Sequence, residues 1–186
     1  MSVEARNEYY KLLKDEYAGE NIPIIFSHGA HELFYNHQVN FNNTDLAEIY
    51  RSNGLIGIEM DKRILGVLEP NEYFVRLRND YRELELSDDV LGFWFQLIAI
   101  AEWATDNGYK TDPWKCISIG SDYDGIINAL KGFYSVKSLS ALLIEIEKCI
   151  EFYWQMPSRK VEVSNTKEII NKIAYQNAID FLKNNY

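Results

Sequence analysis

The chain has 186 residues, enough for one globular domain with a substantial core and marginal for two. Hydrophobic residues make up 47% of it and charged residues 25%, which argues against wholesale disorder. The formal net charge of −9 disfavours general nucleic-acid binding, because a phosphate backbone repels an acidic protein. A complete eight-stranded α/β barrel is also excluded, since that fold takes about 250 residues.

No segment predicts a membrane span or a signal peptide. The most apolar stretch, residues 91–104, contains Gln96 and Glu102 and is shorter than the roughly 20 residues that a spanning helix needs. Cys116 and Cys149 lie far apart in no metal-binding spacing, which favours buried free thiols in a reducing compartment. We therefore expect a cytoplasmic protein, unless a longer chain carries a targeting signal upstream.

Three short apolar runs predict strands. They are rich in Ile and bounded by Gly, Asn, Asp or Pro, which is typical of strands that are covered on both faces. The runs occupy residues 22–27 (IPIIFS), 54–60 (GLIGIEM) and 115–121 (KCISIGS).

Helical patterns lie between and around these runs. Apolar residues at three- and four-residue spacing predict helices at residues 3–18, 44–53, 87–107, 139–150 and 169–182, the second capped by Thr44 and the third by Ser87. Residues 62–85 are rich in charge and predict a long loop with some helix. Strands that alternate with helices indicate right-handed parallel βαβ units and an α/β fold.

Chemically reactive side chains follow all three predicted strands. In parallel α/β folds the carboxyl ends of the strands face the ligand site, so residues from the three ends are expected to meet there. A His beside carboxylates at such an edge suits a divalent metal and the water that it activates. These residues are His28 after the first strand, Glu59, Asp61, Lys62 and Arg63 after the second, and Asp122 and Asp124 after the third.

Structural roles compete with these interpretations. His31 and His37 favour a hydrogen-bonded structural role, whereas His28, between an apolar strand and a glycine, suits either role. The segment SDYDG (residues 121–125) is a turn or a site, because Asp-Gly is a strong turn dipeptide. It is not an EF-hand loop, since Lys131 stands where the bidentate Glu is required. No glycine-rich nucleotide motif or serine-hydrolase motif is present.

The strand-end segments resemble the membrane (renal) dipeptidase family of the amidohydrolase superfamily. IPIIFSHG resembles the family's strand P-V-I-F-S-H-S, GLIGIEMD its next strand, and CISIGSDYDG its last barrel strand, G-[SG]-D-F-D-G. The ending NAIDFLKNNY resembles its C-terminal helix. The family consists of zinc-dependent (β/α)8 barrels that hydrolyse dipeptides and related amides.

The resemblance implies roles for two residues. His28 falls on a metal-ligand histidine, and Asp122 on the catalytic aspartate that takes the proton of the metal-bound water. Asp124 is expected to support the turn through backbone amides. The family's substrate-gripping arginine is replaced by Val39, so the substrate-binding residues are unknown, with Arg63 or His37 as alternatives.

The family's other metal ligands have no counterpart here and would lie upstream of Met1. We therefore expect residues 1–186 to form a single partial domain, the last three strands of a TIM barrel with their helices, inactive or weakly active alone on a small peptide or amide substrate. An oligomer, or a missing N-terminal barrel half, is expected to cover the open strand edges. The alternatives are a non-catalytic binding or assembly module and a small doubly wound domain with a magnesium or phosphoacceptor site.

Overall fold

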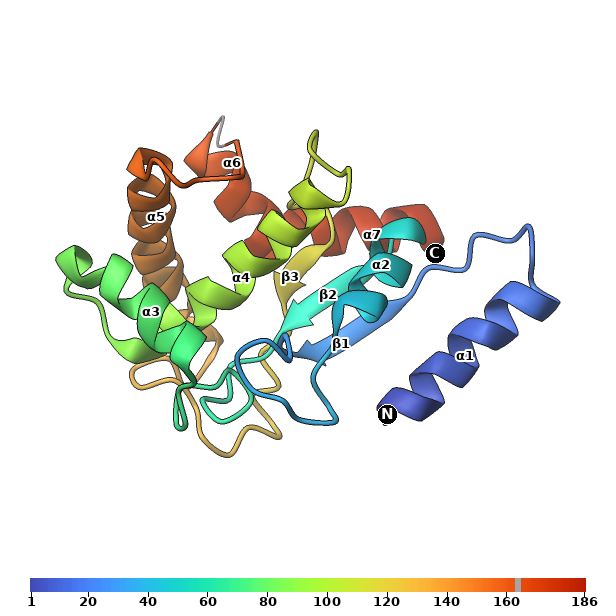
Figure 1. Cartoon of the computed structure of the whole chain (residues 1–186), viewed down its shortest axis with the longest axis horizontal. Coiled ribbons are helices and arrows are strands. Elements are labelled where there is room, and N and C mark those ends of the chain that lie inside the picture. Colours follow the sequence, from blue (N-terminus) through green and yellow to red (C-terminus); the bar gives the residue numbers. More distant parts are fainter. Residues whose placement is uncertain (163–164) are drawn as a thin grey trace.

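A computed structural model describes residues 1–162 and 165–186, which form a mixed α/β fold (Figure 1). The order of helices and strands follows the prediction. The elements are α1 (Val3–Glu16), β1 (Ile25–Gly29), α2 (Asn43–Arg51), β2 (Leu55–Ile58), α3 (Glu72–Asp80), a 3₁₀ turn (Arg82–Leu84), α4 (Asp88–Asp106), β3 (Ile117–Ile119), a 3₁₀ turn (Val136–Ser138), α5 (Leu139–Gln155), α6 (Thr166–Asn171), a π-helical turn (Lys172–Gln176) and α7 (Asn177–Asn185).

The three strands form one parallel sheet in the order β1-β2-β3. Ile25 and Phe26 of β1 pair with Leu55 and Ile56 of β2, whose Ile56 also pairs with Ile117 of β3. The described residues supply three strands, fewer than the roughly five that a doubly wound domain contains.

The first strand differs from its prediction in position and in burial. It begins at Ile25, three residues after the expected start, and continues to Gly29, so His28 lies inside β1 rather than beyond it. The register shifts between Phe26 and Gly29, which marks a β-bulge. Ile25 is 48% exposed, and Ser27 and His28 are also exposed. The prediction of a strand covered on both faces is therefore wrong for β1, which is an edge strand of the sheet that the described residues form.

The opposite edge of the sheet is closed by the C-terminal helices. The π-helical turn and α7 contact β3. The buried Asn177 side chain donates hydrogen bonds of 2.7 Å to the carbonyl oxygens of both Trp114 and Ile117. These two bonds occupy carbonyl oxygens that could otherwise accept hydrogen bonds from a further strand. The β3 edge of the sheet is therefore covered, whereas the β1 edge is not paired within the described residues.

The carbonyl oxygen of Ser27, at the bulge of β1, lies close to the backbone of both Gly57 and Gly120. A side chain at Gly57 or at Gly120 would collide with the same atom, the backbone carbonyl oxygen of Ser27. This carbonyl group of β1 therefore lies against β2 and against the residue that follows β3. Glycine is required at both positions because any Cβ would displace backbone atoms.

Local sequence explains where the helices begin. Ser87 caps α4 by accepting a hydrogen bond from the Val90 amide, as predicted. The cap of α2 is Asn42 and not Thr44, because Asn42 forms a capping box with Asp45. The last predicted helix, residues 169–182, is longer than expected and is interrupted by the π-helical turn.

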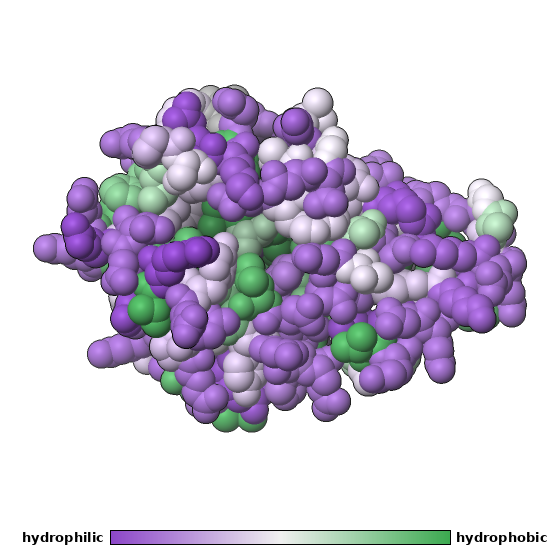
Figure 2. All heavy atoms as spheres, viewed as in Figure 1, coloured by the Kyte–Doolittle hydropathy of each residue, from purple (hydrophilic) through white to green (hydrophobic). Residues whose placement is uncertain are grey.

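The core surrounds α4, whose side chains are buried on nearly every side. Phe93, Trp94 and Phe95 are fully buried there, which is typical of a helix that is apolar all round. Cys116 and Cys149 are buried free thiols, as predicted, and burial raises the pKa of Cys116 to about 12. The face in Figure 2 is largely hydrophilic, with small separate apolar patches flanking α4. Among the described residues, no helix has the length and apolar character needed to cross a membrane.

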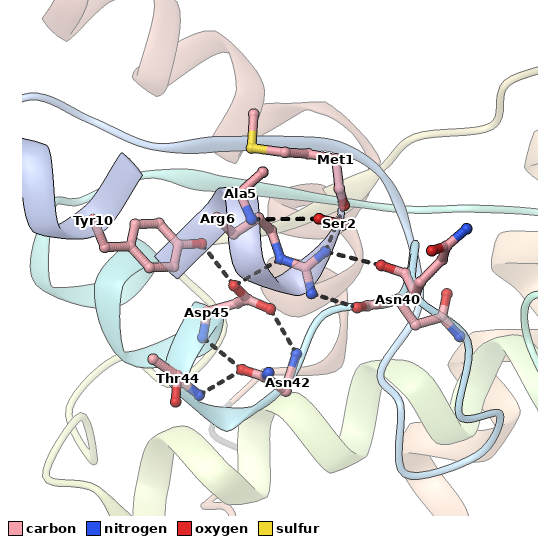
Figure 3. A network of polar contacts seen from close by, with 10 residues as sticks. Met1, Ser2, Ala5, Arg6, Tyr10, Asn40, Asn42, Thr44 and Asp45 are labelled. Carbon is pink, nitrogen blue, oxygen red and sulfur yellow. Dashed lines mark hydrogen bonds and ion pairs between the residues drawn. The ribbon is translucent and has the colours of Figure 1, made fainter. Parts of the chain in front are cut away.

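A buried polar network attaches α1 to the start of α2 (Figure 3). The Arg6 guanidinium donates to the Asp45 carboxylate and to the carbonyl oxygens of Met1, Gln38 and Asn40. α1 thus lies on the β1 side of the sheet, away from α3, α4 and α5 (Figure 1).

Candidate functional site

A cavity of about 410 Å³ lies between α1, β1 and the carboxyl ends of the strands. Its volume falls in the range of small-molecule sites, about 300–1,000 Å³. Residues that follow or end all three strands line it: His28, Glu59, Arg63 and Asp122, together with His37. The structure thus brings to one place the reactive residues that the sequence distributes over three βα units.

His28 occupies the bulge of β1, which turns its side chain toward solvent at the mouth of the cavity. Its Nδ1 atom lies 3.0 Å from the Ser27 hydroxyl. No hydrogen bond within the described part of the chain uses Nε2, so this nitrogen is available to a ligand.

Asp122 adopts a left-handed backbone conformation with φ of 50°. Such a conformation is uncommon for a residue with a side chain, although Asp tolerates it better than most. The carbonyl oxygen of Asp122 accepts hydrogen bonds from the amides of Gly125 (2.9 Å) and Ile126 (2.8 Å). SDYDG is therefore a turn, and that turn presents the Asp122 carboxylate to the cavity.

Glu59 is the less exposed of the two acids that line the cavity, at 7% exposure. Its carboxylate makes no hydrogen bond or ion pair with any other described residue. Burial, reinforced by the negative charges of Asp61 and Asp122, raises its pKa to about 7. The sequence predicted Glu59 at a strand end without a specific role. Its burial, which raises its pKa, could be recognised only from the structure.

Asp61 supports the loop after β3. Its carboxylate accepts hydrogen bonds from the amides of Arg63 (2.8 Å), Asn128 (3.1 Å) and Ile127 (3.3 Å). The sequence assigned a supporting role of this kind to Asp124, which is wrong, because Asp124 is exposed and its carboxylate bonds no described residue. The turn is therefore held by an acid from the neighbouring strand.

The other two histidines separate into two environments. His31 is buried, its Nδ1 accepts from the Leu33 amide, and its Nε2 lies 3.1 Å from the Asn43 side-chain oxygen. Burial lowers its pKa, and the predicted structural role is confirmed. His37 stacks on Tyr35 and lines the cavity.

These residues do not make a complete zinc site. Nowhere in residues 1–162 and 165–186 do three His, Cys, Asp or Glu side chains gather closely enough to hold a metal ion. A catalytic zinc ion requires about three protein ligands. The residues present therefore do not fit the metal that the sequence resemblance implies, and only single ligand positions such as His28 remain.

Val39 also lines the cavity, at the position where the resemblance expects an arginine. Arg6 reaches the same wall, but its guanidinium is already bound to Asp45 and to three carbonyl groups. Arg63 is exposed, and its guanidinium makes no hydrogen bond or ion pair to a described residue. It is therefore a cation at this cavity that remains available to a ligand.

Comparison with protein families gives a match to the family described as membrane dipeptidase (Peptidase family M19), over residues 11–174. The match includes all three strands and every cavity residue from Ile24 onward. A search of curated protein sequences gives no significant match. Because the match spans most of the 186 residues, the chain belongs to the membrane dipeptidase family of peptidases.

Proposed function

We propose that the chain is the C-terminal portion of a metal-dependent amide or dipeptide hydrolase. In this proposal residues 1–186 are one partial domain, equivalent to the last three strands of a (β/α)8 barrel with their helices. The observation that carries it is the convergence of His28 and Asp122, from the first and last family motifs, on one cavity. The parallel order of the strands and the close approach of the Ser27 carbonyl to Gly57 and Gly120 also support a barrel segment.

The chain's own residues have limited roles in this proposal. His28 offers one nitrogen to a metal ion, and Asp122 is placed to exchange a proton with a group bound in the cavity. Because no set of three ligands gathers in the described residues, zinc is expected to bind weakly, and peptide turnover by this chain alone is expected to be slight or nil.

Zinc binding and dipeptide hydrolysis test the proposal directly. We expect isothermal titration calorimetry to detect weak zinc binding that the variant His28→Ala abolishes, while His31→Ala, at the structural histidine, retains it if folded. Purified protein that holds about two equivalents of tight zinc and hydrolyses dipeptides at ordinary enzyme rates would contradict the fragment view. If His28→Ala leaves zinc binding unchanged, the assignment of His28 as a zinc ligand is wrong.

The second candidate function is a binding or assembly module, favoured by the open edge of β1. Asn177 and the C-terminal helices close the β3 edge, whereas exposed Ile25 and Ser27 lie along β1. Unpaired parallel strands are ready to pair with another chain. The measurement is light scattering on the purified protein: an oligomer supports this role, and a well-folded strict monomer counts against it.

A further inference from the structure

A second cavity lies at the opposite end of the sheet from the first, where the strands begin. Its volume is about 460 Å³, within the range of small-molecule sites. Its lining comes from the segments just before β1, β2 and β3 and from α7, which lies beside the amino ends of the strands in Figure 1. It is called the asparagine cavity here because five asparagines line it: Asn21, Asn53, Asn177, Asn184 and Asn185.

Asn177 is the buried member of this set, at 7% exposure. Its Nδ2 donates hydrogen bonds of 2.7 Å to the carbonyl oxygens of Trp114 and Ile117, which fixes the orientation of the amide. No described residue donates to its Oδ1, and this atom is not sealed from the cavity that the residue lines. The buried amide therefore holds an acceptor ready for a ligand.

Asn21 and Asn185 repeat this arrangement with more exposed side chains. The Nδ2 of Asn21 donates to the Ser52 carbonyl oxygen (3.3 Å), and that of Asn185 donates to the Phe181 carbonyl oxygen (2.7 Å). Their Oδ1 atoms likewise accept no hydrogen bond from a described residue. Three amides whose nitrogen is bound to the backbone thus leave three oxygens for a ligand in the asparagine cavity.

Lys115 and Asn53 supply hydrogen-bond donors to the same cavity. The Nζ atom of Lys115 donates to Oδ1 of Asn53 (2.8 Å) and lies 5.2 Å from the ring centroid of Tyr109 and 5.9 Å from that of Tyr50. Because an ammonium group has three donors and Asn53 uses only its oxygen, Nζ protons and the Asn53 Nδ2 group remain for a ligand.

The charges of the lining disfavour ionic ligands. Lys115 and Lys172 balance Asp112 and Asp180, so the lining has no net formal charge. A phosphate group would face amide oxygens and the Asp180 carboxylate, which offer it no donor. A metal ion would meet two lysines, and the described residues gather no set of three His, Cys, Asp or Glu side chains. An apolar ligand would strip water from the amides without replacing its hydrogen bonds.

We propose that the asparagine cavity binds a neutral cyclic polyol, such as a sugar or a cyclitol. A hydroxyl group both donates and accepts hydrogen bonds, so neighbouring hydroxyls satisfy the three amide oxygens together with the donors of Lys115 and Asn53. This site is independent of the proposed hydrolase function, because it lies at the other end of the strands and shares no lining residue with the first cavity.

Amide NMR spectra of the full, isotope-labelled chain test the inference. The probes are glucose and myo-inositol, cyclohexanol as a ring of similar size with a single hydroxyl, and inorganic phosphate and calcium chloride as ionic ligands. Shifts that saturate with probe concentration give both the place of binding and the dissociation constant. Unchanged amide signals far from each substitution establish that the variants are folded.

Asn21→Leu and Asn185→Leu each remove one amide oxygen, and Lys115→Met removes the charge but keeps an unbranched side chain. Asn107→Leu is the matched control: Asn107, like Asn185, bonds the carbonyl oxygen four residues earlier, that of Trp103 (2.8 Å), and it does not line the cavity. We expect each cavity variant to weaken polyol binding about fivefold, the equivalent of one hydrogen bond of about 1 kcal/mol, and the control to bind as wild type does.

Saturating shifts with glucose, with myo-inositol or with both, at the amides that flank Asn53 and Asn184, support the inference and show which polyol the site prefers. Cyclohexanol binding as tightly as either polyol overturns it, since hydroxyl groups are then not what the site recognises. Phosphate or calcium binding in place of the polyols, polyol binding that the three variants leave unaltered, or no saturating shift also overturns it. None of these results bears on the proposed hydrolase function, which stands or falls on His28-dependent zinc binding.

Discussion

The Nε atom of Arg6 lies 3.0 Å from Oδ1 of Asp45, and both side chains are almost completely buried. Tyr10 donates a second hydrogen bond, of 2.7 Å, to the same carboxylate oxygen. Two residues from α1 thus converge on the first turn of α2, and the helix so attached forms one wall of the cavity. The position of α1, and with it the shape of the cavity, depends on this ion pair.

The variant Asp45→Asn tests that dependence. It keeps an oxygen for the Asn42 amide but leaves the Arg6 charge buried without its counter-ion. Removing one partner of a buried ion pair costs about 3–5 kcal/mol, so we expect a loss of that size in the free energy of unfolding, measured in urea. Tyr10→Phe removes only one hydrogen bond to the carboxylate and should cost about 1.5–3 kcal/mol. If Asp45→Asn lowers the free energy of unfolding by no more than Tyr10→Phe does, the ion pair does not hold α1.

The pKa of Glu59 predicts an unusual dependence of stability on pH. Its folded-state pKa of about 7 lies above the ordinary value of 4.5, so the folded state holds its proton more tightly than the unfolded state. Its contribution to stability is present below pH 4.5 and is lost as the pH rises through 7. Glu59→Gln removes the titrating group and with it this loss. The free energy of unfolding of Glu59→Gln, measured in urea, should therefore exceed that of wild type by more at pH 8 than at pH 5.

Glu83→Gln is the matched control, because Glu83 is exposed. It should shift the unfolding free energy equally at the two pH values. If the difference between wild type and Glu59→Gln is the same at pH 5 and pH 8, then Glu59 titrates as an ordinary surface acid, and its placement in the cavity wall is wrong.

Much of the fold could be predicted because local patterns determine it. The spacing of apolar residues located every long helix, Ser87 was recognisable as the cap of α4, and three Ile-rich runs located the strands. The convergence of His28 and Asp122 on one cavity followed from a general property of parallel sheets.

What the sequence could not predict depends on contacts between distant segments. The bulge that moves His28 into β1 arises from pairing with β2, and the exposure of that strand depends on which neighbours are present. Asp61 and Asp124 look alike in sequence, yet only Asp61 meets the amides of the loop after β3. The absence of a gathered set of three metal ligands in the described residues likewise required the positions of all the side chains.

The closed edge of the sheet depends on Asn177. Its side chain donates to two carbonyl oxygens, of Trp114 and Ile117, in a buried environment. Asn177→Leu leaves both acceptors without a partner, at about 1–3 kcal/mol each, and Asn177→Asp adds a carboxylate that repels them. We expect both variants to lower the free energy of unfolding, Asp more than Leu at pH 8. A loss below about 1 kcal/mol in Asn177→Leu would mean that water replaces both bonds.

The close packing of β1 against β2 and the end of β3 is tested at Gly57 and Gly120, where a Cβ would meet the Ser27 carbonyl oxygen in both cases. Each single change to Ala should cost about 1–3 kcal/mol in urea unfolding, because backbone atoms must move. Ser118→Ala, in β3 two residues before Gly120, adds no atom and should cost less than either glycine change.

The double variant Gly57→Ala with Gly120→Ala separates one shared collision from two independent ones. Both alanines meet the Ser27 carbonyl, and each added Cβ would also lie 2.8 Å from Cα of the other glycine, so the combined loss should differ from the sum of the two single losses by about 0.5–3 kcal/mol. Strictly additive losses would show that the two glycines meet different obstacles. In that case the Ser27 carbonyl does not lie against both β2 and the end of β3, and the argument from this close approach to a barrel segment loses its support.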